Sequence, residues 1–134
     1  MTADNVLAVC ALEVAPHQTG FVTPNAISLA EASVHPHAWR RAVLADGELV
    51  GFVMMWDSLE EPGYMLWRLM VAAPHQGRGI GRAIVEQVKA YVATRPGGTF
   101  LKVSAHRGEG APGPFYERLG FVATGEVTGD DDGP

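Results

Sequence analysis

The fold of this chain is decided around one stretch, Gln76-Gly77-Arg78-Gly79-Ile80-Gly81. The residues before it, from Tyr64 to Val71, are mostly aromatic and apolar, which is typical of a buried strand. After it, apolar residues recur every fourth position from Ile80 until Pro96-Gly97-Gly98, which predicts a helix of about four turns. A glycine-rich loop between a strand and a helix lets backbone N–H groups approach a phosphate, because glycine has no β-carbon.

Another apolar stretch, Thr99 to Ala105, predicts a strand after this helix. Strand, loop, helix and strand in this order form a βαβ unit, whose two strands are expected to be parallel. Glycine makes up 16 of the 134 residues, so a GxG pattern alone is weak evidence for a phosphate site. Its position inside a βαβ unit strengthens that interpretation.

The other elements are expected on both sides of this unit. Two β-rich stretches, Trp39–Ala45 and Glu48–Trp56, are joined at Asp46-Gly47, a dipeptide that favours a tight hairpin. Capping and stop signals predict helices at Thr2–Cys10 (N-cap Thr2 or Asp4), Ala26–Ser33 and Pro114–Leu119, with a last strand at Phe121–Val127 and a disordered tail at 129–134.

Length and composition predict a single domain over residues 1–134. The chain is 47% hydrophobic and 19% charged, enough apolar material for one core. Cys10 is the only cysteine, which excludes an intramolecular disulfide and a thiolate-rich metal site and favours a reducing cytoplasm. Because no apolar run approaches the roughly 20 residues of a membrane span, we expect a cytoplasmic protein with no membrane partner.

The net charge of −5 is unevenly distributed. Residues 64–107 carry seven Lys or Arg against one Glu, net +6, between flanks of net −6 and −5. A basic island suits an anionic ligand and acidic flanks suit a cationic one, although ordinary solvated surface charge explains the layout equally well. The sequence pI of about 5.4 argues against nucleic acid as a partner.

The loop sequence narrows the phosphate ligand. A nucleotide P-loop needs Gly-Lys-Ser/Thr, but Gly81 is followed by Arg82-Ala83. A dinucleotide fingerprint needs a third glycine and, about 20 residues later, an acid, where Ile84 and Leu101 stand. A pyrophosphate-bearing cofactor without magnesium remains, of which coenzyme A is the common one, and Arg78 and Arg82 can add charge-assisted contacts.

Two motifs resemble those of the GNAT superfamily of N-acetyltransferases. The stretch from Arg68-Leu69-Met70-Val71 through Gln76 to Ala83 is similar to the family's central motif, and Phe115-Tyr116-Glu117-Arg118-Leu119-Gly120-Phe121 is similar to its C-terminal signature. Segments 24–32 and 108–116 also resemble a branch of bacterial polyamine N-acetyltransferases. The resemblance implies an α/β (α+β) fold with a mixed, mainly antiparallel central sheet, flanked by helices and built around the βαβ unit.

The resemblance also implies a mechanism, in which an amine attacks the thioester of acetyl-CoA directly. Tyr116 would protonate the departing thiolate, since its reference pKa of about 10 keeps it protonated at neutral pH. One backbone N–H beside the pantetheine arm would stabilise the oxyanion. The residues implied to bind the cofactor are Leu69, Met70, Val71, Gln76, Gly77, Arg78, Gly79, Ile80, Gly81 and Arg82.

The base that deprotonates the amine is not singled out by spacing. Glu31, Glu109 and His106 are candidates in descending order, and a chain of water molecules is an alternative. Met65 stands where an acidic residue could serve a polyamine, so this sequence departs from that branch. A small cationic, polyamine-like amine is the expected acceptor; the alternatives are lysine acetylation on peptides or proteins, and a CoA-binding regulatory module without turnover.

Several aromatic and histidine residues have a structural interpretation. His35 and His37 flank Pro36 without a clear third ligand, so we expect no metal. The tryptophans Trp39, Trp56 and Trp67 are expected in the core or in a pocket wall. Tyr116 on a short amphipathic helix is by itself more often a packing residue, and only its motif favours a catalytic role.

The ends of the chain depart from the pattern that the resemblance implies. GNAT domains begin with a strand before the first helix and finish with one after the strand that begins near Phe121. Here Thr2 already resembles a helix cap and the tail is acidic, so both outermost strands are expected to be missing. Either the chain is a trimmed fragment or another subunit covers the edge positions. Because exposed sheet edges invite pairing, we expect a homodimer.

Overall fold

The computed structural model describes residues 1–18, 23–60, 63–103 and 113–121. Four strands and four α-helices occur within these residues, together with two 3-10 turns. In chain order they are α1 (Val6–Ala11), a 3-10 turn (Pro16–Gln18), α2 (Asn25–Ala32), β1 (Ala38–Ala45), β2 (Glu48–Trp56), β3 (Met65–Val71), a 3-10 turn (Ala73–His75), α3 (Ile80–Ala93), β4 (Lys102–Val103) and α4 (Gly113–Arg118).

The strands form one mixed sheet in the order β1-β2-β3-β4. The pairs β1–β2 and β2–β3 are antiparallel, whereas β4 runs parallel to β3 and pairs with Met65 and Leu66. The expected βαβ unit is therefore β3–α3–β4, and the predicted mixed, mainly antiparallel sheet flanked by helices is confirmed. The hairpin is confirmed too: Asp46 and Gly47 have φ angles of 52° and 80°, as a tight turn between antiparallel strands requires.

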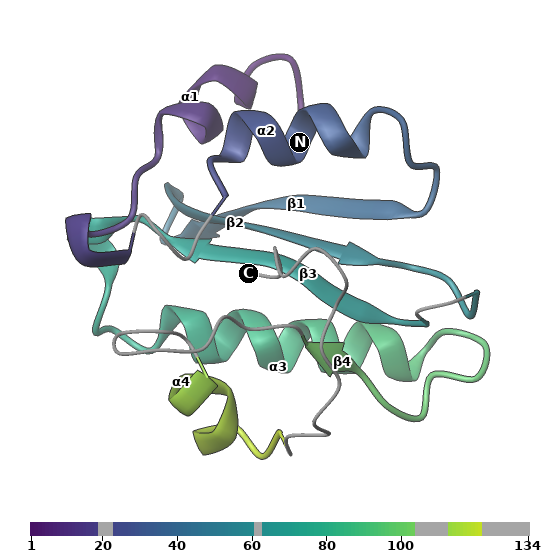
Figure 1. Ribbon diagram of the computed structural model, residues 1–134. Coiled ribbons are helices and arrows are strands. Elements are labelled where there is room, and N and C mark those ends of the chain that lie inside the picture. The colour runs from purple at the N-terminus through teal and green to yellow at the C-terminus, as the bar shows by residue number, and fades with distance from the viewer. Residues whose placement is uncertain (19–22, 61–62, 104–112, 122–134) are drawn as a thin grey trace.

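The helices cover the two faces of the sheet (Figure 1). Helices α1 and α2 lie on one face, and α3 lies on the other with α4 beside it. Each face has its own apolar core. On the α1/α2 side the buried residues are Val9, Ala32, Ala38, Phe52, Met54 and Met70, and on the α3 side they are Val53, Met55, Tyr64, Leu66, Ile84, Val85, Val88, Val92 and Tyr116.

A β-bulge interrupts β3 at Trp67. Leu66 lies opposite Met55 and Arg68 lies opposite Met54, so Trp67 has no partner of its own on β2. Such an extra residue changes which side chains face which side of the sheet. Trp67 and Arg68 consequently lie on the same side: Trp67 packs against the α1/α2 core and Arg68 bonds to Glu31 of α2, whereas Leu66 and Leu69 pack with the α3 core.

The first helix differs from the sequence prediction. Helix α1 begins at Val6, and its N-cap residue is Asn5 rather than Thr2 or Asp4. The Asn5 side chain accepts a hydrogen bond from the Thr2 N–H at 2.8 Å, which closes a turn before the helix. The predicted cap was wrong because a short polar side chain can bond back to the chain as readily as forward into a helix.

Two other boundaries concern the ends of the sheet. Residues 1–18 contain no strand, so β1 lies at an edge of the sheet. Phe121 is not part of a strand, and the rest of the predicted strand at Phe121–Val127 lies outside the described residues, as does the tail at 129–134.

Helix α2 begins one residue earlier than predicted, with Pro24 as its N-cap.

Candidate active site

The glycine-rich loop leaves the amino end of α3 open. Gly77 and Gly79 both have a φ angle of 78°, and Gly79 is the N-cap residue of α3. Within the described part of the chain no side chain caps this end, so the first N–H groups of α3 have no cap from the loop. A β-carbon added at Gly77 or Gly79 would meet nothing within 4 Å. Space, free N–H groups and the helix dipole together suit an anion.

Gly81 has a different role from the other two loop glycines. A β-carbon at Gly81 would lie 3.2 Å from the Cζ atom of Phe115, which is closer than most real contacts. The absent side chain therefore lets α4 approach α3. Gly81 thus connects the two sequence motifs physically, because the first motif supplies the gap and the second supplies the ring that fills it.

The charges around the loop are positive. Arg78 and Arg82 are both exposed, and the first turn of α3 contains no acid. The Nη1 atom of Arg78 lies 2.9 Å from Nδ1 of His75, which can accept a hydrogen bond from it and so hold the guanidinium beside the loop. The loop can therefore neutralise a pyrophosphate with side chains as well as with backbone groups.

Gln76 fastens the loop to the sheet. Its side-chain amide donates hydrogen bonds to the Val71 carbonyl at 2.9 Å and to Oε1 of Gln18 at 2.7 Å. The side chain of Gln76 is thus engaged within the protein, and it fixes where the loop leaves β3. Sequence reasoning grouped Gln76 with the cofactor contacts and did not predict this bracing role.

The backbone of β3 has two sides. The Ala72 N–H donates to the Val50 carbonyl of β2, and the Met70 carbonyl lies toward Gly51, where a β-carbon would be 2.5 Å from it. Because alternate residues of a strand direct their polar groups to opposite sides, Leu69 and Val71 direct theirs away from β2. The Val71 carbonyl that Gln76 contacts agrees with this direction. Leu69 and Val71 can therefore meet a ligand beside β3, whereas Met70 bonds toward β2 and buries its side chain.

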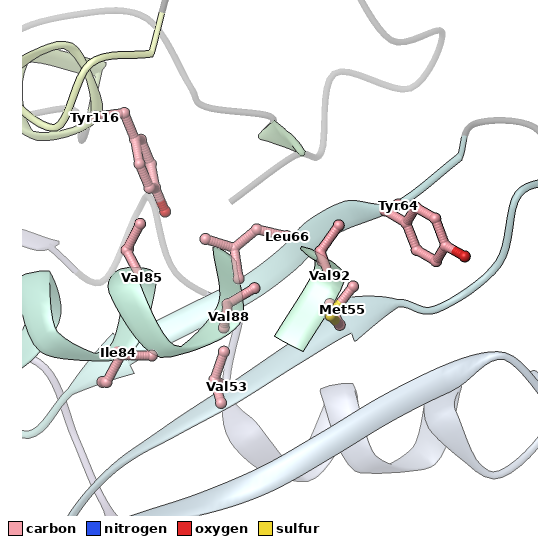
Figure 2. Packing of buried hydrophobic residues seen from close by; sticks show 9 residues of the cluster. All are labelled: Val53, Met55, Tyr64, Leu66, Ile84, Val85, Val88, Val92 and Tyr116. Carbon is pink, nitrogen blue, oxygen red and sulfur yellow. The ribbon is translucent and has the colours of Figure 1, made fainter. Parts of the chain in front are cut away.

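Tyr116 enters the α3-side core from α4, with its hydroxyl directed toward α3 and β3 (Figure 2). Its side chain is only 5% exposed, and its ring contacts Phe115 and Phe121 at centroid distances of 5.2 and 5.7 Å. Burial alone raises the pKa of the Tyr116 hydroxyl well above that of a free tyrosine. The group is therefore fully protonated at neutral pH.

Glu31, on α2, lies on the face of the sheet opposite α3 and contacts β3 there. One carboxylate oxygen accepts a hydrogen bond from Arg68 Nη2 at 2.9 Å, and the Arg68 side chain is 8% exposed against 37% for Glu31. Sequence reasoning noted Arg68 only as part of a motif. The signal that identifies it is an arginine in the middle of a buried strand, since such a charge needs a partner.

The remaining candidate bases have different outcomes. His106 and Glu109 lie outside the described residues. Met65 begins β3, where it pairs with Trp56 of β2 and Lys102 of β4, so no acid stands at that position. Glu31 is thus the one candidate base that the described residues place.

His35 and His37 contact indole rings. The His35 ring lies 5.6 Å from Trp67 and 6.0 Å from Trp56, and the His37 ring lies 5.3 Å from Trp56, all edge-on. Within the described ranges no three His, Cys, Asp or Glu side chains are grouped so that they could hold a metal ion. The three tryptophans are all partly buried, as expected, and Trp39 stacks on Tyr91.

A family model described as an acetyltransferase (GNAT) domain matches residues 4–123. The chain belongs to the GNAT family. A 5-NmdU N-acetyltransferase from Pseudomonas phage PaMx11 is 27% identical to this GNAT chain over 107 residues, which is 80% of this chain and 74% of that protein. This GNAT protein is therefore an acetyltransferase, and the family's co-substrate is acetyl-CoA.

Solved structures share the GNAT fold. A ribosomal-protein-alanine N-acetyltransferase from Brucella melitensis biovar Abortus 2308 has a TM-score of 0.61 at 23% identity and covers 79% of each chain. A structure from Desulfovibrio desulfuricans, described as a GNAT-family acetyltransferase, has a TM-score of 0.66 at 22% identity over 95% of this chain and 84% of that one. At such identities the likeness concerns the fold. None of the described helices is long and apolar enough to cross a membrane.

Proposed function

We propose that this GNAT protein transfers an acetyl group from acetyl-CoA to the primary amine of a small cationic acceptor. The observation that carries the proposal is the open amino end of α3. Two left-handed glycines, an uncapped helix start and two exposed arginines meet there, and Tyr116 is buried beside the same helix. The acidic segments on either side of the basic island favour a cationic acceptor.

The residues of this chain fit acetyl-CoA in two places. The backbone of residues 77–82, with Arg78 and Arg82, would hold the pyrophosphate at the helix start. The outward backbone groups of Leu69 and Val71 would meet the pantetheine arm beside β3. Bound acetyl-CoA supplies the activated acyl group, so the protein has only to orient it, stabilise charge and move protons.

Backbone groups of β3 and the Tyr116 hydroxyl would stabilise the oxyanion and protonate the leaving sulfur. A backbone N–H of Leu69 or Val71 would donate to the oxyanion that forms when the amine nitrogen attacks the thioester carbon; a donor of this kind contributes about 10²- to 10³-fold in rate. Tyr116 would give its proton to the sulfur as the C–S bond breaks. Its raised pKa keeps that proton in place beforehand and makes early transfer unfavourable, so the transfer accompanies bond breaking.

Glu31 is the proposed base, or the anchor for the acceptor's charge. A primary amine with a pKa near that of lysine, about 10.4, must lose a proton before it attacks. Arg68 donates a hydrogen bond to one carboxylate oxygen of Glu31, and the Glu31 side chain is partly exposed to solvent. Arg68 would therefore fix Glu31 in place while leaving it accessible to an amine. Glu109 and His106 are the alternatives.

Two observations favour other acceptors. The phage relative is named for 5-NmdU, and the Brucella structure is named for ribosomal-protein alanine, so amines on a nucleoside or on a peptide belong in any screen. Thiol release from acetyl-CoA should be measured with polyamines, aminoglycosides, lysine peptides and aminomethylated nucleosides, with calorimetry of CoA binding alongside. Turnover is expected with a polyamine-like amine. Turnover only with peptides or nucleosides would replace the acceptor class, and CoA binding without turnover would indicate a regulatory module.

Replacing Tyr116 by Phe tests the proposed acid. Tyr116→Phe should lower kcat by about 10²-fold or more while CoA binding stays within about twofold. Tyr64→Phe is the matched control, because Tyr64 is equally buried in the same core and its hydroxyl bonds to the Pro96 carbonyl instead. Equal kcat losses in the two variants would mean that packing, not proton transfer, explains the effect.

We further propose that the protein folds as one domain and forms a homodimer in the cytoplasm. Cys10 is the only cysteine, and β1 is an edge strand whose outer side has no strand partner among the described residues. A single cysteine suits a reducing compartment. An edge strand with a free outer side suits pairing between two subunits. Light scattering at micromolar concentrations would show a dimer mass, and a monomer mass throughout would contradict it.

A further inference from the structure

A second site lies at the opposite end of α3 from the glycine-rich loop. A cavity of about 440 Å³ opens where the start of β1 meets the residues that follow α3. Its walls include His37, Trp39, Arg40, Arg41, Asp57 and Arg95. Helix α3 has 14 residues and is therefore about 21 Å long, which separates this cavity from the proposed cofactor loop. The cavity volume is within the range of small-molecule sites, about 300–1,000 Å³.

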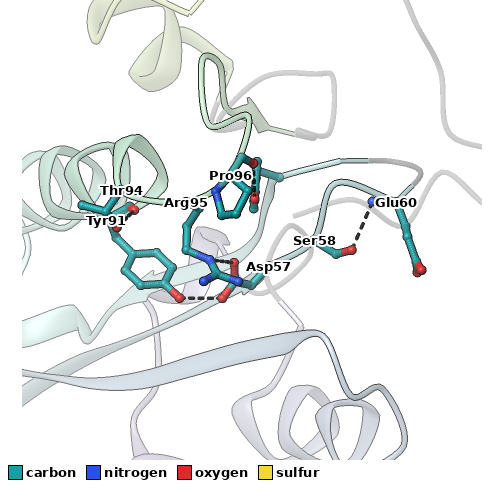
Figure 3. Close-up of polar contacts among 8 residues, drawn as sticks. Asp57, Ser58, Glu60, Tyr91, Thr94, Arg95 and Pro96 are labelled. Atoms are coloured by element: carbon teal, nitrogen blue, oxygen red, sulfur yellow. Dashed lines mark hydrogen bonds and ion pairs between the residues drawn. The ribbon is translucent and has the colours of Figure 1, made fainter.

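Among the described residues that line the cavity, basic side chains outnumber acidic ones. Asp57 is the only acid among the described lining residues, and both its carboxylate oxygens are engaged: Oδ1 accepts from Arg95 Nε at 2.9 Å and Oδ2 from the Tyr91 hydroxyl at 2.5 Å (Figure 3). Among the described residues Arg40 and Arg41 form no ion pair, and their hydrogen bonds go to the carbonyls of Ala38 and Arg40. Two guanidinium charges are thus available to a ligand.

These cations are held by a connected set of contacts. The Arg41 guanidinium lies 4.5 Å from the Trp39 ring, which stacks on Tyr91 at 5.1 Å. Tyr91 bonds to Asp57, which in turn holds Arg95 through Nε and leaves its terminal amino groups for other partners. Side chains that are already positioned lose less entropy when they bind a ligand.

We infer that this cavity binds a small molecule with two negative charges, carried by carboxylates or by a phosphate. Arg41 and Arg95 would contact one anionic group with paired N–H donors, the geometry that guanidinium groups offer to carboxylates and phosphates. Arg40 would face the second, and His37, whose Nε2 atom lies 3.4 Å from a carboxylate oxygen of Glu60, would line the wall beside it. The aromatic surface of Trp39 provides an apolar wall between them. The site is independent of the acetyl-transfer chemistry proposed above.

Calorimetry with two probes tests the inference. Citrate and inorganic pyrophosphate are titrated separately into the full-length protein in excess CoA, which occupies the other anion site. We expect saturable binding of at least one probe at one molecule per chain, weakened by added salt. Citrate alone would indicate a carboxylate ligand, and pyrophosphate alone a phosphate. No saturable heat from either probe would overturn the inference.

Single substitutions locate the binding. Arg41→Gln and Arg40→Gln should each lower the affinity about tenfold, the usual effect of losing one charge-assisted contact. Arg118→Gln, an exposed arginine in the last turn of α4, is the matched control and should leave affinity unchanged. The indole N–H NMR signal of Trp39, assigned with Trp39→Phe, should shift on binding. Equal affinities in all three arginine variants would mean that Arg40 and Arg41 do not contact the probe, and would overturn the inference.

Discussion

The two ends of helix α3 are built in opposite ways. At its amino end, Gly79 caps the helix without a side chain, and both Gly77 and Gly79 face open space. At its carboxyl end, Tyr91 and Arg95 are tied to Asp57, and the Tyr64 hydroxyl bonds to the Pro96 carbonyl (Figure 3). Within the described residues, side-chain hydrogen bonds tie down the carboxyl end of α3, whereas no side chain caps its amino end.

This difference shows where the helix contributes to function and where it contributes to stability. Free N–H groups at a helix start cost stability unless water or a ligand satisfies them. The side-chain network at the other end holds the helix against the sheet. Changes at the amino end should therefore alter binding more than folding, and changes at the carboxyl end should do the reverse.

The largest expected effect is at Gly79. Gly79→Ala and Gly47→Ala both place a β-carbon on a residue with φ near 80° and no neighbour within 4 Å, so each should cost about 1 kcal/mol of stability. Only Gly79→Ala should lower CoA affinity, by about tenfold or more, because its new methyl group enters the space of the pyrophosphate. Chemical denaturation and calorimetry on the pair give both numbers. Equal CoA affinities would show that the open end of α3 is not the binding site.

The next effect is at Asp57. Asp57→Ala removes the hydrogen-bond acceptor of both Tyr91 and Arg95, and we expect the free energy of unfolding to fall by about 1–2 kcal/mol. CoA affinity should not change. Glu86→Ala, which removes an exposed acid from α3, is the control and should be nearly neutral. A loss of CoA affinity in Asp57→Ala would mean that the two ends are coupled.

The smallest effect is a pH dependence. The hydrogen bond to Asp57, followed by burial, raises the pKa of Tyr91 above the ordinary value of 10.0. The stabilisation is therefore complete below about pH 10 and is lost as the pH rises through the raised value. Urea unfolding from pH 8 to 11 should show a steeper decline for the native protein than for Tyr91→Phe, by about half a kcal/mol or less because water screens the half-buried group. If the two proteins lose stability equally between pH 8 and 11, ionisation of Tyr91 does not contribute to the pH dependence of unfolding.

Local patterns predicted most of the fold. Strand β2 has the predicted bounds, the turn at Asp46-Gly47 was identified from its dipeptide, and α3 starts at Ile80 as its four-residue period indicated. These features depend on neighbours in sequence, where side-chain periodicity and turn chemistry act. The cap of α1 was wrong because several polar residues compete for one turn, and the outcome depends on fractions of a kcal/mol.

The site could be predicted in type but not in arrangement. The motif identified the loop glycines, yet it did not distinguish Gly81, which accommodates Phe115, from Gly77 and Gly79, which face open space. It did not reveal that Arg68 holds Glu31 or that Asp57 joins Tyr91 and Arg95, because these partners are 37, 34 and 38 residues apart. Contacts at such separations follow from the sheet register, which no local pattern contains.

The bulge in β3 also bears on how this strand can change in evolution. Deleting one residue from a regular strand turns every later side chain to the wrong face. In β3 the loss of Trp67 alone would leave Leu66 opposite Met55 and Arg68 opposite Met54, as they are now. The register of β3 thus does not depend on this residue. The Trp67 ring contributes packing rather than register, since it lies against the α1/α2 core and edge-on to Trp56 and His35.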